Sequence, residues 1–244
     1  MNSTIKEFIS EFCGTFIMIL LGTGVVAMAV LFNGSKGGYE NITWAWGFAV
    51  MFGIYVGTYS GAHLNPAVTF GLAITKRFAW KKVPHYMFAQ LLGAFFASAI
   101  VYGNYYSLIH QVDPQLSKTA GIFTTFPEIK SNLLVGFIDQ VLGTFVLLYL
   151  ILASVNHLTK NKVQFLIPII IAFLVVTIGM CFGGLHGYAI NPARDFGPRL
   201  MVTIMGFSNN GLTDGSFIFL VPIIGPLLGA ALGALAYDRS IDKL

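Results

Sequence analysis

Long apolar runs alternate with short polar connections along the whole chain. Six of these runs are long enough to cross a bilayer as helices, because a spanning helix needs about 20 apolar residues. Two shorter apolar segments remain, and each begins with Asn-Pro-Ala, in which proline suits the first turn of a helix. The pattern predicts six spanning helices at residues 7–32, 42–59, 83–108, 133–155, 165–182 and 217–237, and two half-helices at residues 65–75 and 191–204.

The two halves of the chain repeat each other. SGAHLNPAV follows the second span and HGYAINPAR follows the fifth, while EFCGTF and DQVLGTF open the first and fourth spans. Three spans and one half-helix form each unit, so the second unit enters the membrane from the opposite side. We therefore predict an all-α membrane protein in one domain, residues 1–244, built as an inverted repeat. The repeats cover residues 5–108 and 132–238, and an extracellular loop at residues 109–131 connects them.

Composition and charge agree with this class and exclude others. The chain is 56% hydrophobic and 10% charged, whereas a soluble domain carries about 25% charged residues. The net charge of +4 is small and its basic residues lie at segment ends, which excludes nucleic acid as a partner. Nine Lys or Arg residues fall in the inner segments and three in the outer loops, so both termini are expected in the cytoplasm.

The paired Asn-Pro-Ala segments point to a polar passage. Two half-helices that meet with their N-termini leave unpaired N–H groups and positive dipole ends inside the membrane. Asn65 and Asn191 can cap these ends with side-chain oxygens and present amide N–H donors to a neutral solute. The same positive field opposes cations and protons. The alternative, that each Asn-Pro is only a turn before a helix, explains one copy better than two matching copies in segments too short to span.

From Glu11 to Tyr237 the sequence resembles the major intrinsic protein family of aquaporins and glycerol facilitators, and SGAHLNPAVT and NPARDFGPR carry the resemblance. The resemblance implies a homotetramer of six-helix channels in the cell membrane, each subunit with its own pore and none with a cofactor. Asp195 and Arg199 after NPAR are similar to the glycerol-conducting branch. Neither His63 nor His186 has neighbours at metal-ligand spacing, so no metal is expected.

Four residues are expected to form a selectivity filter. A charge inside the membrane is costly, so Arg194 is a functional candidate, and its planar fork of donors suits two neighbouring hydroxyl oxygens. The resemblance places Arg194, Trp46, Gly179 and Tyr188 at the narrow outer constriction, with Ala45 as the alternative to Trp46. In the family, phenylalanine is usual at the position of Tyr188, and the added hydroxyl narrows or polarises the filter.

Other residues are expected to support the half-helices and their loops. In the family, intramembrane acids hold these loops, which suggests this role for Glu11; its alternative is an exposed carboxylate near the inner surface. In the second half, Gln140 stands at the position where the family usually has this acid, with Asp139 beside it. His186 is expected in the outer approach, as a hydrogen-bonded structural residue or a titrating gate. The remaining members of this supporting set are His63, Pro66, Ala67, Pro192, Ala193 and Asp195.

The leading interpretation is a passive channel for glycerol and other small neutral solutes, with some water, that excludes protons and ions. A channel mainly for water or hydrogen peroxide is the alternative, and Tyr188 is the feature that favours it. A coupled transporter would need several titratable groups along the pore, and an enzyme would need a nucleophile–base pair or metal cluster. A scaffold would not need the two Asn residues and Arg194. Urea and neutral organic acids are further candidate solutes, and the lipid bilayer is the surrounding partner.

Overall fold

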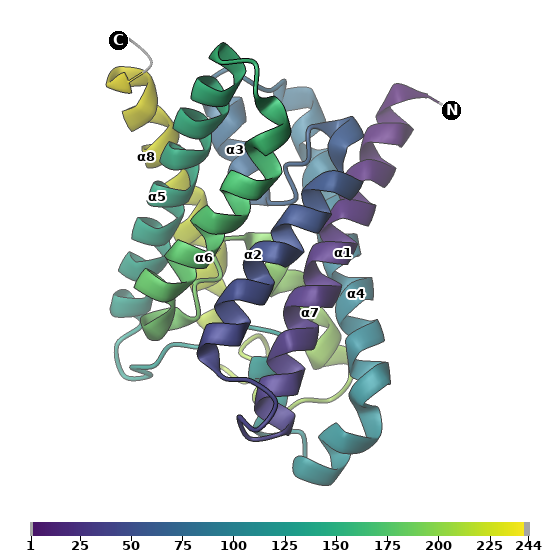
Figure 1. Cartoon of the computed structure of the whole chain (residues 1–244). Helices are drawn as coiled ribbons and strands as arrows, with labels where there is room; N and C mark the ends of the chain where they lie inside the picture. Colours follow the sequence, from purple (N-terminus) through teal and green to yellow (C-terminus); the bar gives the residue numbers. More distant parts are fainter. Residues whose placement is uncertain (1, 242–244) are drawn as a thin grey trace.

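The computed structural model describes residues 2–241, and these residues form eight α-helices, with short 3-10 turns and no strand (Figure 1). The first four helices belong to the first half of the chain and the last four to the second. Lys243, one of the nine basic residues assigned to the inner segments, lies outside the described residues. The helices are α1 (Ser3–Leu31), α2 (Tyr39–Val56), α3 (Pro66–Ile74), α4 (Val83–Val112), α5 (Leu133–Lys160), α6 (Ile167–His186), α7 (Pro192–Ile204) and α8 (Val221–Arg239).

The predicted fold class is confirmed, and each expected span and half-helix corresponds to one of the helices. Five of the long helices are apolar and long enough to cross a membrane. The helix α2 is not among the five, because Glu40 and Asn41 in its first turn lower its hydropathy. It nevertheless packs between α1 and α6. The predicted boundaries differ by a few residues, since polar residues extend α4 and α5 beyond their apolar parts.

The two halves of the chain pack together through their short helices as well as through their long ones. In the first half α1 packs against α2 and α4, and in the second α5 packs against α6 and α8. The half-helices cross over, because α3 lies against α8 while α7 lies against α4. The start of α1 and the end of α8 lie at the same end of the bundle (Figure 1).

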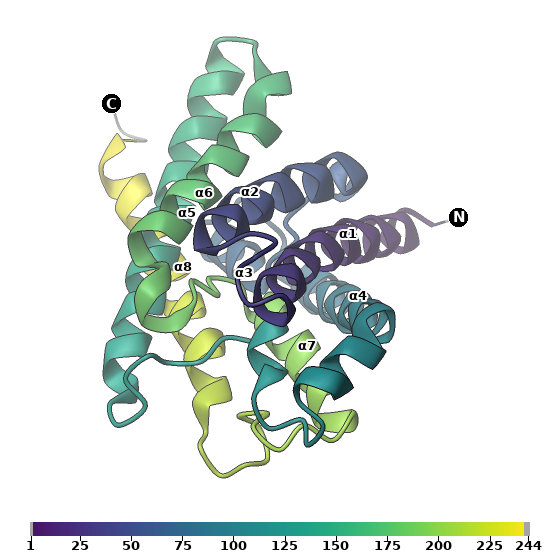
Figure 2. The same cartoon turned by 60° about the horizontal axis from the view of Figure 1, so that its bottom comes forward.

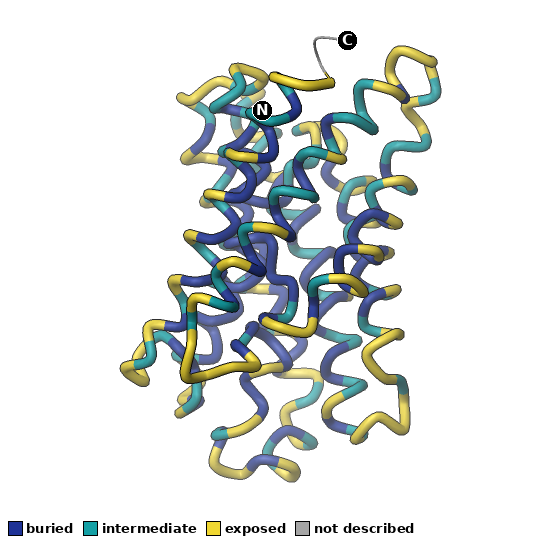
Figure 3. Tube along the Cα trace, turned by 90° about the vertical axis from the view of Figure 1, so that its left-hand side faces the viewer, coloured by how far each residue is buried: buried dark blue, intermediate teal, exposed yellow. Residues whose placement is uncertain are grey.

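The buried residues lie along the middle of the bundle, and exposed residues alternate with buried ones on the outer helix faces (Figure 3). The outer faces of α2, α4 and α6 carry many large exposed apolar side chains, as a lipid-facing surface requires. At the end opposite the termini, two long loops at residues 113–132 and 205–217 cover the bundle (Figure 2). These loops lie near the N-terminal part of α7, which carries the expected filter arginine.

Glycines let the helices approach closely where α1 crosses α4. A Cβ atom added to Gly93 of α4 would meet the backbone carbonyl oxygen of Phe12, and it would lie 3.1 Å from the backbone nitrogen of Phe16. Small residues at helix crossings are typical of membrane proteins, where close backbone packing replaces the hydrophobic driving force. Gly103 is on the same helix, and a Cβ there would meet no atom within 4 Å.

We predict that Gly93→Ala lowers the stability of the folded bundle by about 1–3 kcal/mol, because the added methyl group forces α1 and α4 apart. Gly103→Ala is the matched control on the same helix. It should leave stability unchanged or raise it by up to about 1 kcal/mol through helix propensity. Thermal unfolding of both variants in detergent measures the difference, and equal midpoints for the two variants would contradict the packing account.

Candidate functional site

The two half-helices meet near the middle of the bundle, where each asparagine caps its own half-helix and binds the loop before the other one. The side-chain oxygen of Asn65 accepts a hydrogen bond from the Ala67 backbone N–H at 2.8 Å, which caps α3. Its amide nitrogen donates to the carbonyl oxygen of Ile190, in the opposite loop, also at 2.8 Å. Asn191 repeats this arrangement, capping α7 through the backbone N–H of Ala193 at 3.0 Å.

The second crosswise bond runs from the amide nitrogen of Asn191 to the carbonyl oxygen of Leu64, at 2.9 Å. Pro66 and Pro192 follow the two asparagines as the first helical residues, as the sequence predicts. The capping role of the asparagines was expected, whereas the crosswise bonds between the loops were not. Each amide group has two N–H hydrogens, so the crosswise bond leaves one donor on each asparagine.

The loops before the two asparagines have matching strained backbones. Leu64 and Ile190, one residue before each asparagine, have positive φ angles of 53° and 43°. Ala62 and Tyr188, three residues before, also have positive φ, at 52° and 34°. Left-handed conformations cost about 1–2 kcal/mol in residues with a side chain, so surrounding groups must hold them in place.

A buried carboxylate holds the first of these loops. Glu11 of α1 has no exposed surface, and its two oxygens accept hydrogen bonds from the backbone N–H groups of His63, at 2.9 Å, and Leu64, at 2.8 Å. The side chains of Ser60 and Gln90 donate two further bonds to it. Glu11 therefore contacts the loop as expected, and the alternative of an exposed carboxylate is wrong.

An amide holds the second loop in the corresponding place on α5. The side-chain oxygen of Gln140 accepts from the backbone N–H of Ile190 at 2.8 Å, and its nitrogen donates to the carbonyl oxygen of His186 at 3.2 Å. Asp139 does not join these contacts, and one of its oxygens is buried without a hydrogen-bond partner within residues 2–241. The neutral amide thus replaces the acid by using one acceptor and one donor.

A cavity of about 300 Å³ passes both asparagines and ends beside the expected filter. Its wall is mostly apolar, with side chains such as Val50, Leu147 and Ile171. The polar exceptions include His63, whose Nδ1 lies 3.1 Å from the hydroxyl of Thr69. At the filter end the lining residues include Trp46, Tyr188 and Arg194, together with the two asparagines, Asn65 and Asn191.

Arg194 is held against an aromatic ring at this end of the cavity. Its guanidinium carbon lies 4.3 Å from the centroid of the Trp46 ring, which is a cation–π contact. One of its terminal nitrogens donates to the carbonyl oxygen of Phe123 at 2.9 Å. Trp46, and not its neighbour Ala45, lines the cavity, and Trp46 is 4% exposed. Gly22 of α1 provides the space, because a Cβ there would lie 2.5 Å from the indole ring.

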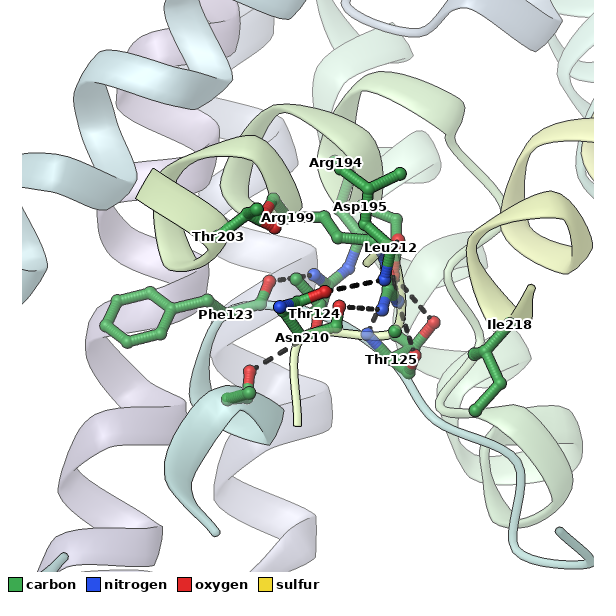
Figure 4. Close-up of polar contacts among 12 residues, drawn as sticks. Phe123, Thr124, Thr125, Arg194, Asp195, Arg199, Thr203, Asn210, Leu212 and Ile218 are labelled. Carbon is green, nitrogen blue, oxygen red and sulfur yellow. Dashed lines mark hydrogen bonds and ion pairs between the residues drawn. The ribbon is translucent and has the colours of Figure 1, made fainter. Parts of the chain in front are cut away.

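The loop that contacts Arg194 is fixed by a buried ion pair on α7 (Figure 4). Asp195 accepts from the Nε atom of Arg199 at 2.7 Å and from the backbone N–H of Thr125 at 2.7 Å. Arg199 in turn donates to the carbonyl oxygens of Thr125 and Asn210, both at 2.7 Å. Asp195 makes no hydrogen bond to Arg194 within residues 2–241, and its hydrogen bonds go to Thr125 of the surrounding loop and to Arg199.

Gly179 and Tyr188 lie together, and the tyrosine fills the space that the glycine leaves. A Cβ on Gly179 would be 2.9 Å from the Cζ atom of Tyr188. The Tyr188 hydroxyl is buried and has no hydrogen-bond partner in the described chain. Gly179 itself does not line the cavity, whereas Tyr188 does. The smallness of Gly179 therefore makes room for the side chain of Tyr188.

His186 differs from the expectation of a residue in the outer approach. It is the last residue of α6, and its side chain is fully buried. Neither ring nitrogen has a hydrogen-bond partner among residues 2–241, so the expected hydrogen-bonded role is not observed. A Cβ on Gly136 of α5 would collide with its ring, which shows how closely the two helices pack there.

Sequence reasoning missed the residues that hold the filter from outside the two motifs. Gly22 and Phe123 carry no local signal, because a spanning helix and a loop both contain many such residues. Asp113 is a third example, at the C-terminal end of α4. Its carboxylate accepts hydrogen bonds from the backbone N–H groups of Lys118, at 2.7 Å, and Thr119, at 2.9 Å. It thereby fixes the start of the loop that brings Phe123 to Arg194.

Comparison with known proteins gives consistent matches. The sequence model of the Major intrinsic protein family matches residues 1–237. The probable glycerol uptake facilitator protein of Thermotoga maritima is 44% identical over 238 residues, which cover 95% of this chain and 97% of that protein. Aquaglyceroporin-9 of Botryotinia fuckeliana is 41% identical over 96% of this chain, but the chain spans only 53% of its length. The X-ray structure of the aquaglyceroporin from Plasmodium falciparum superposes with a TM-score of 0.87 at 35% identity, covering 98% of this chain and 97% of that one.

We predict that acid weakens the loop anchored by Asp113. Burial disfavours the charged carboxylate, but the hydrogen bonds from Ser117, Lys118 and Thr119 outweigh it and lower the pKa of Asp113 from its ordinary 3.8 to about 2. The carboxylate therefore contributes stability that is fully present above about pH 4 and is lost as pH falls through about 2.

Asp113→Asn removes this dependence, because an amide does not titrate in this range. Thermal unfolding in detergent from pH 7 to pH 2 compares the two proteins. We expect the variant to be less stable at pH 7 and the difference to shrink below pH 4. A difference that stays constant down to pH 2 would show that the carboxylate charge does not stabilise the loop.

Proposed function

Because the chain belongs to the major intrinsic protein family, we propose that it is a passive membrane channel for glycerol and other small neutral solutes. In this proposal it also passes some water and excludes protons and ions. Relatives named as glycerol uptake facilitators and aquaglyceroporins, similar over nearly the whole chain, support glycerol as the main solute.

One observation carries the proposal: the apolar cavity ends where the Arg194 guanidinium stacks on Trp46. A glycerol molecule has a carbon chain on one side and hydroxyl groups on the other. The ring offers an apolar wall for the carbons, while the guanidinium has donors left beyond its bond to Phe123. Because the filter groups are already fixed, they replace part of the solute hydration without a large cost of reorganisation.

Passage then proceeds in single file past the two asparagines. The free amide N–H groups of Asn65 and Asn191 donate to the oxygen of the solute at the point where the positive ends of α3 and α7 meet. These donors and dipoles repel cations and interrupt a proton-conducting chain of water molecules. We assign to Glu11 and Gln140 the positioning of the two loops, with His63, Pro66, Ala67, Pro192, Ala193 and Asp195 in supporting positions.

The proposal extends to the assembly and orientation of the protein. We place it in the cell membrane as a multi-pass homotetramer, with both termini cytoplasmic and residues 5–108 and 132–238 as the inverted repeats. The distribution of Lys and Arg supports this orientation. The exposed apolar faces of α2 and α4 are suited to contact with lipid or with neighbouring subunits.

A channel mainly for water or hydrogen peroxide is the second candidate, and one observation favours it. Tyr188 lines the cavity at the filter, and its ring reduces the space for a three-carbon solute more than for water or hydrogen peroxide. The permeability ratio of glycerol to water distinguishes the two candidates.

The first test uses purified protein in liposomes, with shrinkage and re-swelling followed by light scattering. We expect re-swelling under a glycerol gradient to be faster than in empty liposomes. An impermeant sugar gradient gives the water permeability of the same vesicles. Fast water flux without glycerol entry would overturn the main proposal in favour of the second candidate.

We predict that Arg194→Ala relaxes the solute selection of the channel. Loss of the charged donor weakens hydroxyl recognition and removes the positive charge that opposes cations, so the preference for glycerol over larger polyols should fall by roughly tenfold. Vesicles with a pH-sensitive dye report any proton leak. Arg239→Ala, which removes an exposed arginine at the end of α8, is the control. Unchanged preference and unchanged exclusion in a folded variant would remove Arg194 from the filter.

A further inference from the structure

Tyr39 is the first residue of α2, and it reaches across to the filter. The sequence pattern placed it in the polar connection before the second span, which was predicted to start at residue 42. In the structure α2 begins at Tyr39, and the side chain of Asn41 accepts a hydrogen bond from the backbone N–H of Gly38 at this helix start. The ring therefore projects from the outer end of α2 towards α6.

The phenol hydroxyl of Tyr39 is hydrogen-bonded to a backbone carbonyl of α6. It donates to the carbonyl oxygen of Gly179 at 2.7 Å. A helical carbonyl can accept this bond in addition to its own intrahelical one, because its oxygen has two lone pairs.

Tyr39 also packs on the tyrosine that lines the cavity. The ring centroids of Tyr39 and Tyr188 are 6.5 Å apart, and the rings meet edge to face at 85°. Gly179 and Gly183, one turn apart on α6, leave the space that the two rings fill. A Cβ on Gly183 would collide with the Tyr39 hydroxyl and would lie 2.7 Å from Cδ1 of Tyr188.

The cavity reaches only one ring of this pair. Tyr188 is among its lining residues, whereas Tyr39, Gly179 and Gly183 are not. Tyr39 is 47% exposed, but its hydroxyl is held by the Gly179 carbonyl. The phenol therefore contacts Tyr188 without lining the cavity itself.

We infer that Tyr39 is a positioning residue for selectivity, which holds Tyr188 in place at the filter and thereby limits the entry of polyols. The inference rests on the proposed channel function and adds a side chain that neither Asn-Pro-Ala motif contains. Tyr188 packs on the Tyr39 ring, so the position of Tyr188, and with it the space left at the filter for a longer polyol, depends on that ring.

Two substitutions separate the hydroxyl from the ring. Tyr39→Phe keeps the ring but removes the hydrogen bond that ties it to Gly179, so Tyr188 loses a fixed neighbour and glycerol permeability relative to water should rise by roughly 2- to 10-fold, the value of one neutral hydrogen bond in an equilibrium constant. Tyr39→Ala also removes the ring, so the permeability of a four-carbon polyol should rise relative to that of glycerol. Tyr55→Phe and Tyr55→Ala, at an exposed tyrosine of the same helix, are the matched controls.

Light scattering of liposomes with wild type and each variant gives water, glycerol and erythritol permeabilities, normalised to the protein incorporated. Size-exclusion chromatography and thermal unfolding establish that each variant is folded. Permeability ratios that are equal in wild type and both Tyr39 variants would overturn the inference, and so would equal changes in the Tyr55 controls.

The same experiment distinguishes failure of this inference from failure of the proposed function. A wild-type protein that passes glycerol, with unchanged Tyr39 variants, overturns only the role of Tyr39. A wild-type protein that passes water but no glycerol overturns glycerol as its solute. In that case glycerol or erythritol entry gained in the Tyr39 variants supports the role of the phenol, and its absence overturns that role.

Discussion

The structure depends on one constraint: backbone groups that end inside the bundle, at membrane depth, must find partners within the protein. An unsatisfied N–H or C=O group in hydrocarbon costs several kcal/mol, so two half-helices are tolerated only where their ends are paired. Asn65 and Asn191 satisfy this constraint in both directions, because each caps its own half-helix and binds the carbonyl before the other asparagine. The two halves of the chain are therefore joined at their centre by side-chain hydrogen bonds as well as by packing.

The left-handed turns before the asparagines explain why buried polar groups are needed on α1 and α5. Leu64 and Ile190 have positive φ, and their carbonyl groups accept hydrogen bonds from the opposite asparagine. Glu11 and Gln140 hold these turns through the backbone N–H groups of the same two residues. The acid contacts its loop through acceptors alone, whereas the amide uses one acceptor and one donor. The two loops thus have similar shapes but are held by an acid in one half and a neutral amide in the other, a difference that an exact internal repeat would not produce.

The sequence predicted the elements that local patterns determine. The half-helix starts followed from Asn-Pro, and the long helices followed from apolar length, to within a few residues at their ends. Gly93→Ala tests a feature of a different kind, because the need for glycine there arises from a carbonyl on another helix. The same applies to Gly22 beneath Trp46, to Phe123 beside Arg194 and to Tyr39 on Gly179. Each of these contacts joins segments far apart in the chain, so no local spacing indicates it.

The centre and the filter are built in different ways, and this difference bears on how selectivity can change. At the centre the contacts of Asn65, Asn191, Glu11 and Gln140 each satisfy a strained loop or a helix end, so a substitution at these residues disturbs the fold. The filter instead takes single groups from separate elements, with Trp46 from α2, the Phe123 carbonyl from a loop and Arg194 from α7. Asp195 and Arg199 fix this loop from outside the cavity. Side chains at the filter can therefore be exchanged while the half-helices stay in place, which allows one fold to discriminate among different small solutes.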